Sequence, residues 1–133
     1  MTNPTRVLVV EDDQHVATLL VELLRSEGFE PTVATDGLEG LLQLQSGTHD
    51  IALLDIMMPD VDGERLLRQL HEEGGGALPL PIIVVTGSPE GADRCRALLG
   101  DDRVFDKPFD PDELMERVRD VLRAHGARQG GVA

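Results

Sequence analysis

Short apolar runs rich in valine, isoleucine and leucine recur along the chain and predict the strands of a sheet. Four clear runs occupy residues 6–10, 31–34, 50–55 and 81–86, and a weaker fifth run occupies residues 103–106. Three of the runs are almost continuously hydrophobic. This pattern is typical of strands that are covered on both faces within a parallel sheet.

The segments between these runs carry apolar residues at helical spacing. Each segment places its apolar side chains on one face of a predicted helix. These predicted buried faces are Val16, Leu20, Leu23 and Leu24; Leu38, Leu41 and Leu42; Leu66, Leu67 and Leu70; Ala92, Cys95, Leu98 and Leu99; and Leu114, Val118, Val121 and Leu122. Asp36 and Asp110 are predicted to cap the second and the fifth helix at their N-termini.

The alternation of strands with helices indicates an α/β fold, in which a doubly wound parallel sheet of five strands is flanked by five helices. The length of 133 residues suits a single domain, which we predict over residues 1–125. Residues 126–133 lack periodicity and are predicted to form a flexible C-terminal tail or the start of a linker. The glycine-rich segment 74–81 is predicted to be a loop.

Composition and charge narrow the classes of function. Aromatic residues make up only 2% of the chain, so the predicted core is aliphatic and the stacking platforms of single-strand nucleic-acid binders are missing. The formal net charge of −13 argues against direct contact with nucleic acid or an anionic membrane. One cysteine excludes an intramolecular disulfide. Because neither a signal peptide nor a bilayer-spanning segment is apparent, we expect a cytoplasmic protein.

Polar residues gather where the predicted strands end. Open parallel sheets place their chemistry at the carboxyl ends of the strands, so we expect these residues to share one edge. They are Glu11, Asp12 and Asp13 after the first strand, Asp55 after the third, Thr86, Gly87 and Ser88 after the fourth, and Lys107 and Pro108 after the fifth. Oxygen ligands in this number, without a cysteine or histidine pair, suit Mg²⁺. Asp13 is favoured as a helix cap, with metal binding as its second interpretation.

Four motifs at these positions resemble the receiver domain of two-component response regulators. They are VVEDD at 9–13, LLDIMMPDVDG at 53–63, VVTG at 84–87 and DKPF at 106–109. Each motif alone is weakly specific, but all four in order, each at the end of a predicted strand, are strongly specific. The resemblance covers roughly residues 6–124 and implies a CheY-like, flavodoxin-like fold with strand order 2-1-3-4-5.

By this resemblance Asp55 is the phosphoacceptor, which takes a phosphoryl group from a histidine kinase or a histidine phosphotransfer protein. The resemblance implies that phosphorylation of Asp55 then alters contacts with a downstream protein target or an output domain. The Mg²⁺ ligands that the resemblance implies are Glu11, Asp12, Asp55 and the backbone carbonyl of Met57. These assignments agree with the chemistry of phosphoryl transfer. A carboxylate is ionised at neutral pH and can attack without a general base, and the transfer depends on positioning and charge neutralisation.

The resemblance also assigns the phosphate-binding positions and exposes a departure from the family. Thr86 and Lys107 match the hydroxyl and the cation that bond phosphoryl oxygens, and the Lys107–Pro108 peptide is typically cis in this family. At the switch position, where the family often has an aromatic residue, this chain has Val104. The usual relay of threonine and aromatic residue therefore cannot operate in its usual form. Met57, two residues after the acceptor, suggests slow-to-moderate hydrolysis of the acyl phosphate.

Two other classes of function remain open beside this signalling domain. A phosphorylation-independent interaction module of the same fold is disfavoured, because the acceptor, metal and phosphate positions are all filled. An aspartyl-phosphate phosphohydrolase usually carries a second acid where this chain has Met57, so we expect no true enzyme. From the start MTNPT we expect the receiver to come first in its polypeptide. Because 133 residues leave no room for an output domain, we expect either a stand-alone receiver or one cut from a longer regulator at the glycine-rich tail.

Overall fold

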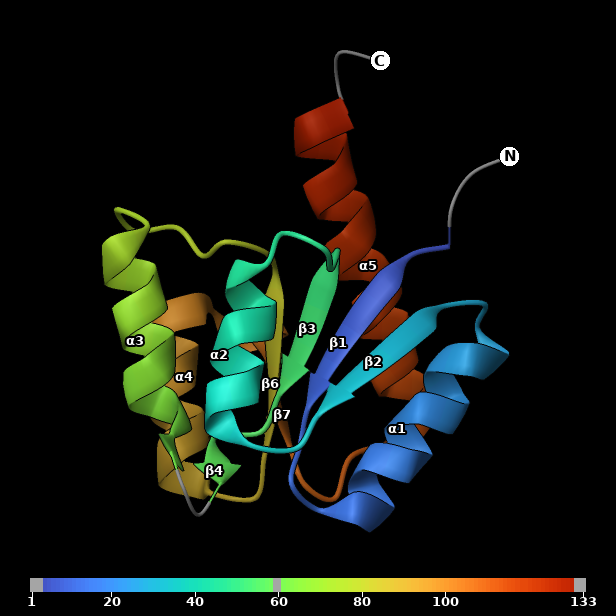
Figure 1. Cartoon of the computed structure of the whole chain (residues 1–133), viewed down its shortest axis with the longest axis horizontal. Coiled ribbons are helices and arrows are strands. Elements are labelled where there is room, and N and C mark those ends of the chain that lie inside the picture. Colours follow the sequence, from blue (N-terminus) through green and yellow to red (C-terminus); the bar gives the residue numbers. More distant parts are fainter. Residues whose placement is uncertain (1–3, 59–60, 131–133) are drawn as a thin grey trace.

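A computed structural model of the protein describes residues 4–58 and 61–130, with side chains described as far as residue 125. Strands and helices alternate along the chain (Figure 1). The long strands are β1 (Arg6–Val10), β2 (Glu30–Ala34), β3 (Ile51–Leu54), β6 (Ile82–Thr86) and β7 (Val104–Asp106). The helices are α1 (Gln14–Ser26), α2 (Gly37–Gln45), α3 (Gly63–Glu73), α4 (Pro89–Leu99) and α5 (Pro111–Gly130), with a short 3₁₀ helix at Asp101–Arg103.

The long strands form one parallel sheet in the order β2-β1-β3-β6-β7, which confirms the predicted fold class and strand order. Helices α1 and α5 cover one face of the sheet, and α2, α3 and α4 cover the other (Figure 1). Successive side chains of a strand point to opposite faces, so each central strand contributes to both cores. In β1, Leu8 packs on the side of α2 and α3, whereas Val9 packs on the side of α1 and α5.

The predicted helix caps are confirmed. An Oδ1 oxygen of Asp13 accepts hydrogen bonds from the backbone N–H groups of His15 and Val16, at 2.9 and 3.2 Å. Asp36 and Asp110 accept equivalent bonds at the starts of α2 and α5. These bonds satisfy N–H groups that have no partner within the helix. The side chain of Asp13 is thus engaged as a cap, in agreement with its favoured interpretation.

The predicted buried face of α2 is wrong. Leu38 and Leu42 are 65% and 61% exposed, and only Leu41 of that face packs against the core. The helix instead turns Gly40 and Leu44 toward the sheet, where a Cβ on Gly40 would lie 2.8 Å from a methyl carbon of a β1 valine. Glycine carries no hydrophobic signal, so a face built on close approach escapes a search for leucine periodicity. The other four predicted faces are buried or half-buried, as expected.

Two further features differ from the sequence-based expectation. A small antiparallel hairpin, β4 (Met57–Met58) with β5 (Val61–Asp62), follows β3 directly. Helix α5 continues to Gly130, so residues 126–130 of the predicted flexible tail are helical, while residues 131–133 lie outside the described part of the chain. The segment 74–81 is a loop, as predicted. Among the described residues, no helix is long and apolar enough to cross a membrane.

The two leucines at opposite sides of α2 provide a matched test of the corrected face. Leu44→Ala removes a side chain that is 2% exposed, so we expect the free energy of unfolding to fall by about 2–4 kcal/mol. Leu42→Ala removes an exposed side chain and should change it by less than about 0.5 kcal/mol. Urea denaturation measures both. Equal losses in the two variants would contradict the observed orientation of α2.

Candidate functional site

The carboxyl ends of the strands bring the predicted polar residues to one edge, the lower edge of the sheet in Figure 1. Val10 and Leu54 are paired in register, so the residues that follow them, Glu11 and Asp55, leave neighbouring strands at the same level. The backbone N–H of Asp55 donates to the carbonyl of Val10 at 3.0 Å. Parallel pairing of adjacent strands is therefore what places one acid beside the other.

Three carboxylates converge at this edge. One oxygen from each of Glu11, Asp12 and Asp55 can be chosen so that all three lie within 4.8 Å of one another. Glu11 and Asp55 are 2% and 6% exposed, whereas Asp12 faces solvent. Oxygen-only donors with one open side suit a hard divalent cation that keeps some of its water, as Mg²⁺ does. The donor set of the described residues thus fits the metal that the sequence predicts.

Lys107 supplies a cation to the two buried acids. Its Nζ donates to Oε1 of Glu11 at 2.7 Å and to Oδ2 of Asp55 at 3.2 Å. Burial lowers the pKa of Lys107, but the bond to Glu11 and the charge of Asp55 outweigh this effect and the pKa is raised overall. Lys107 therefore stays protonated, and it is the only lysine in the sequence.

Glu11 is the titratable group that burial affects most clearly at this edge. Burial raises its pKa to about 7, opposed by the hydrogen bond from Lys107 and reinforced by the hydrogen bond and charge of Asp55. The ionised form of Glu11 thus lacks compensation from its present neighbours. A divalent cation in contact with these carboxylates would stabilise the ionised form of Glu11.

The remaining predicted positions lie at the same edge of the sheet. The backbone N–H of Met57 donates to Oδ1 of Asp55 at 2.9 Å, while its side chain is 58% exposed. Thr86 is fully buried, and its hydroxyl oxygen accepts a hydrogen bond from the backbone N–H of Ser88 at 3.1 Å. The Lys107–Pro108 peptide bond is cis. Hydrogen bonds thus join Lys107, Glu11 and Asp55 directly, whereas Thr86 bonds to its own loop.

Sequence reasoning missed two polar contacts next to this edge. Ser88 caps α4, with its hydroxyl oxygen accepting from the N–H of Gly91 at 3.0 Å. A serine directly before proline and glutamate is a recognisable helix start, so this signal was available. The second contact is an ion pair between Arg96 and Asp106. The unusual polar residue at the end of a buried strand was its only sign.

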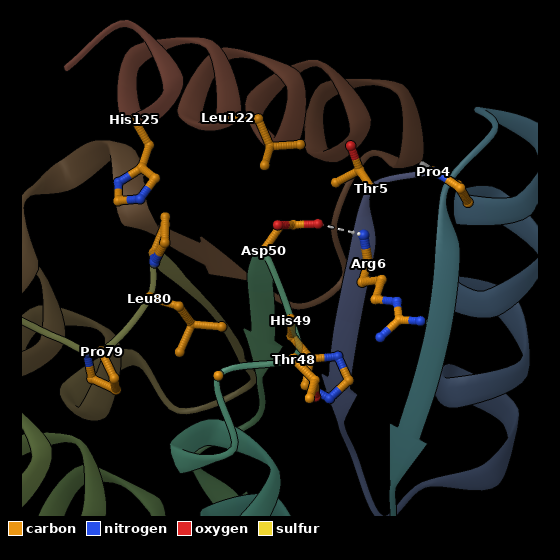
Figure 2. A pocket seen from close by; sticks show the side chains of 12 residues that line it. Pro4, Thr5, Arg6, Thr48, His49, Asp50, Pro79, Leu80, Leu122 and His125 are labelled. Atoms are coloured by element: carbon orange, nitrogen blue, oxygen red, sulfur yellow. Dashed lines mark hydrogen bonds between the residues drawn. The ribbon is translucent and has the colours of Figure 1, made fainter. Parts of the chain in front are cut away.

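A cavity of about 890 Å³ lies at the opposite, amino end of the strands. Figure 2 shows it between the start of β1, the loop before β3 and the end of α5, with the carboxylate of Asp50 turned toward the backbone nitrogen of Arg6. His49 and His125 also line it. Size alone does not make this cavity the reactive site, because the converging carboxylates and the lysine lie at the other edge of the sheet.

Comparison with known proteins shows the family of the chain. The family model described as the response regulator receiver domain matches residues 7–119. The chain belongs to the response regulator receiver family. The sensory transduction protein RegX3 of Mycobacterium tuberculosis is 41% identical over 92% of this chain and 52% of its own length. The transcriptional regulatory protein DltR of Streptococcus agalactiae is 37% identical over 96% of this chain and 58% of its own length.

Solved receiver structures share the fold. The CheY-like receiver domain protein from Methanospirillum hungatei superposes with a TM-score of 0.80 at 30% identity, covering 95% of this chain and 99% of that one. The response regulator TrrA from Thermotoga maritima, solved in complex with Mg²⁺ and BeF, has a TM-score of 0.75 at 31% identity, with coverage of 88% and 98%. The chain spans about half the length of the curated relatives described above.

The raised pKa of Glu11 predicts a pH dependence of stability in metal-free protein. Its pKa rises from 4.5 to about 7 on folding, so its contribution is present below pH 4.5 and is lost as the pH rises toward 7. The loss should be on the order of 3 kcal/mol, because the pKa rises by about 2.5 units and one unit corresponds to about 1.4 kcal/mol. We expect Glu11→Gln to remove this loss.

The measurement is urea denaturation in a chelator between pH 4.5 and 7.5, taken as the difference between the variant and the unmodified protein. The difference in the free energy of unfolding cancels the contributions of the titratable groups that both proteins share. Glu22→Gln, at an exposed position of α1, is the control and should parallel the unmodified protein. A difference that does not change with pH would contradict the assigned pKa of Glu11.

Proposed function

We propose that this receiver domain accepts a phosphoryl group on Asp55 in a Mg²⁺-dependent reaction. The donor is a histidine kinase or a histidine phosphotransfer protein, and the product changes the affinity of the domain for a protein target or an output domain. The observation that carries the proposal is the cluster of Glu11, Asp12 and Asp55 within 4.8 Å, with Lys107 Nζ 3.2 Å from Asp55. Membership of the receiver family supports it.

In the proposed reaction a carboxylate oxygen of Asp55 attacks the phosphorus atom of phosphohistidine. The phosphorus–nitrogen bond breaks, its electron pair remains on the imidazole nitrogen, which takes up a proton, and an acyl phosphate forms. An ionised carboxylate needs no general base for this attack. The N–H of Met57, which already donates to Asp55, holds the carboxylate in a fixed orientation.

Glu11, Asp12 and Asp55 would hold Mg²⁺, with the backbone carbonyl of Met57 as a further ligand. When bound, Mg²⁺ neutralises the carboxylates and the negative charge of the transferring group. Three carboxylates carry a charge of −3, and one divalent ion with Lys107 carries +3. This charge balance supports the assignment of magnesium, and the raised pKa of Glu11 without a metal supports it independently.

Lys107 and Thr86 are proposed to receive the product. Lys107 would exchange its bond to Asp55 for a bond to a phosphoryl oxygen. The Thr86 hydroxyl would turn from the N–H of Ser88 toward a second phosphoryl oxygen. The exposed thioether of Met57 offers no polar group to orient an attacking water, so we propose slow-to-moderate hydrolysis. The same feature disfavours a phosphohydrolase, which would need an acid there to protonate a leaving group.

The names of the relatives support an output in gene regulation. RegX3 is named a sensory transduction protein and DltR a transcriptional regulatory protein. We propose that this domain influences such an output through protein contacts, because a net charge of −13 repels the phosphates of DNA. Action in the cytoplasm, without direct contact to nucleic acid or membrane, completes the proposal. We also propose that the receiver domain ends near residue 125, because the family model ends at residue 119.

Replacement of the acceptor tests the proposal directly. Incubation with acetyl phosphate and Mg²⁺ should add one phosphoryl group per chain, and Asp55→Asn should abolish the addition because the amide is not a nucleophile of this kind. Intact-protein mass spectrometry measures the product. Asp62→Asn is the matched control, since Asp62 is an exposed acid in the same loop region whose capping role asparagine can keep. Labelling that persists in Asp55→Asn would contradict the assignment.

Removal of the lysine tests the phosphate-binding role. Lys107→Gln eliminates the cation beside Asp55, so we expect the rate of labelling by acetyl phosphate to fall about 100-fold, the usual effect of losing one preorganised donor. Time courses of labelling measure the rate. Arg65→Gln, at an exposed position on α3, should label at the unmodified rate. A rate unaffected by Lys107→Gln would remove Lys107 from the proposed site.

A further inference from the structure

An ion pair ties α4 to the residue directly before Lys107. Nη2 of Arg96 donates to Oδ2 of Asp106 at 2.6 Å. Arg96 lies in α4, and Asp106 is the last residue of β7. The pair therefore connects a helix on the surface of the domain to the strand end that carries the only lysine.

The direction of the β7 side chains explains why Asp106 can reach α4. Val104 is buried in the core shared with α3 and α4, whereas Phe105 packs on the opposite face, in the core shared with α1 and α5. Alternation along the strand returns Asp106 to the side of Val104. Val104 packs there among apolar side chains, whereas Arg96 and Asp106 form a polar contact between α4 and β7.

The backbone places Asp106 between the two proposed phosphate-binding residues. Asp106 is the register partner of Thr86 in the sheet. The backbone N–H of Lys107 donates to the carbonyl of Thr86 at 2.8 Å. A shift of this strand end therefore moves Asp106, Lys107 and the backbone of Thr86 together.

The start of α4 is attached to the same threonine. The N–H of Ser88 donates to the Thr86 hydroxyl at 3.1 Å, and the Ser88 hydroxyl accepts from the N–H of Gly91 in the first turn of α4 at 3.0 Å. Helix α4 is thus connected to the edge of the sheet at two places, through Ser88 at its beginning and through Arg96 farther along. Both connections lead to groups that would rearrange when a phosphoryl group occupies Asp55.

We propose that Arg96 and Asp106 are positioning residues, which hold Lys107 in place and couple occupancy of Asp55 to the position of α4. This inference rests on the proposed phosphoacceptor function. The ion pair acts at the strand end where an aromatic residue would act in many relatives, and it does so with charge and hydrogen bonding. Coupling is reciprocal, so the position of α4 also influences how well Lys107 meets the acceptor.

The partly exposed ion pair sets the size of the effect. The side chains of Arg96 and Asp106 are 28% and 55% exposed, so solvent screens their attraction. A pair of this kind changes an equilibrium by about two- to fivefold. Nη1 of Arg96 also lies 3.6 Å from Oδ1 of Asp93, whose side chain is 81% exposed. Both residues of that second pair belong to α4, so it does not connect the helix to β7.

Two single-copy residues flank the ion pair and provide specific reporters. Cys95 precedes Arg96 and is the only cysteine, and Lys107 follows Asp106 and is the only lysine. Chains labelled with ¹⁵N-cysteine or ¹⁵N-lysine each give one backbone amide signal. Titration with beryllofluoride in Mg²⁺, a mimic of the acyl phosphate, should shift both signals in the unmodified protein. The Lys107 signal reports the site, and the Cys95 signal reports α4.

In Asp106→Asn we expect the Lys107 signal still to respond, with an apparent dissociation constant for beryllofluoride about two- to fivefold higher. The response of Cys95 should fall below half of the unmodified shift. The charge exchange Arg96→Asp with Asp106→Arg should restore both. Arg94→Gln is the matched control, because Arg94 pairs from the same helix with Glu64 of α3 at 2.7 Å and does not contact β7 through that pair.

Thermal unfolding checks that each variant is folded, and a lower melting temperature with unchanged titrations would show a purely structural ion pair. Unmodified titrations in Asp106→Asn would overturn the coupling alone, as would failure of the folded charge-exchange variant to restore them. Absence of any response to beryllofluoride in the unmodified protein would overturn the proposed function and the coupling together.

Discussion

The contact of Lys107 with two buried carboxylates is the interaction on which the rest of the site depends. Glu11 and Asp55 emerge from adjacent strands at the same level, and each is almost fully buried. Such acids repel one another and lose their hydration, so a cation must compensate for their charge. Lys107, directly after the edge strand β7, supplies one positive charge. The parallel sheet, which gathers β1, β3, β6 and β7 at one edge, makes that contact possible.

One cation leaves this cluster short of neutrality. The pKa of Glu11 is raised to about 7 chiefly by burial, even with Lys107 in contact. A divalent ion would complete the balance, and the arrival of a phosphoryl group would then give Lys107 a second negative partner. The site thus combines acids that attract a metal with a lysine free to turn toward a product. This combination would serve the proposed phosphoryl transfer without any general base.

Much of this arrangement could be predicted from the sequence, because strands buried on both faces and acids placed directly after them leave a clear pattern. The face of α2 could not, since Gly40 packs through the absence of a side chain and leaves no hydrophobic signal. The hairpin after β3 is built from strands of two residues, too short for a periodic pattern. The pair of Arg96 and Asp106 depends on the distance between a helix and a strand, which only the folded chain determines.

With Val104 at the position where the family often has an aromatic residue, the route that we propose from the site to the surface is a polar one. Helix α4 is connected to Thr86 through Ser88 and to the strand end through Arg96. Both connections use polar contacts that can rearrange at small cost, in contrast to the apolar packing that holds the rest of α4. In the proposed coupling, signal transmission therefore centres on charges beside the site.

A crystal structure of the protein with Mg²⁺ and beryllofluoride would show whether these side chains form one phosphoryl site. We expect beryllium bonded to a carboxylate oxygen of Asp55, the magnesium ion in contact with Glu11, Asp12 and Asp55, and Lys107 Nζ within hydrogen-bonding distance of a fluoride. An uncoordinated Asp55, or an ion bound away from these three carboxylates, would contradict it.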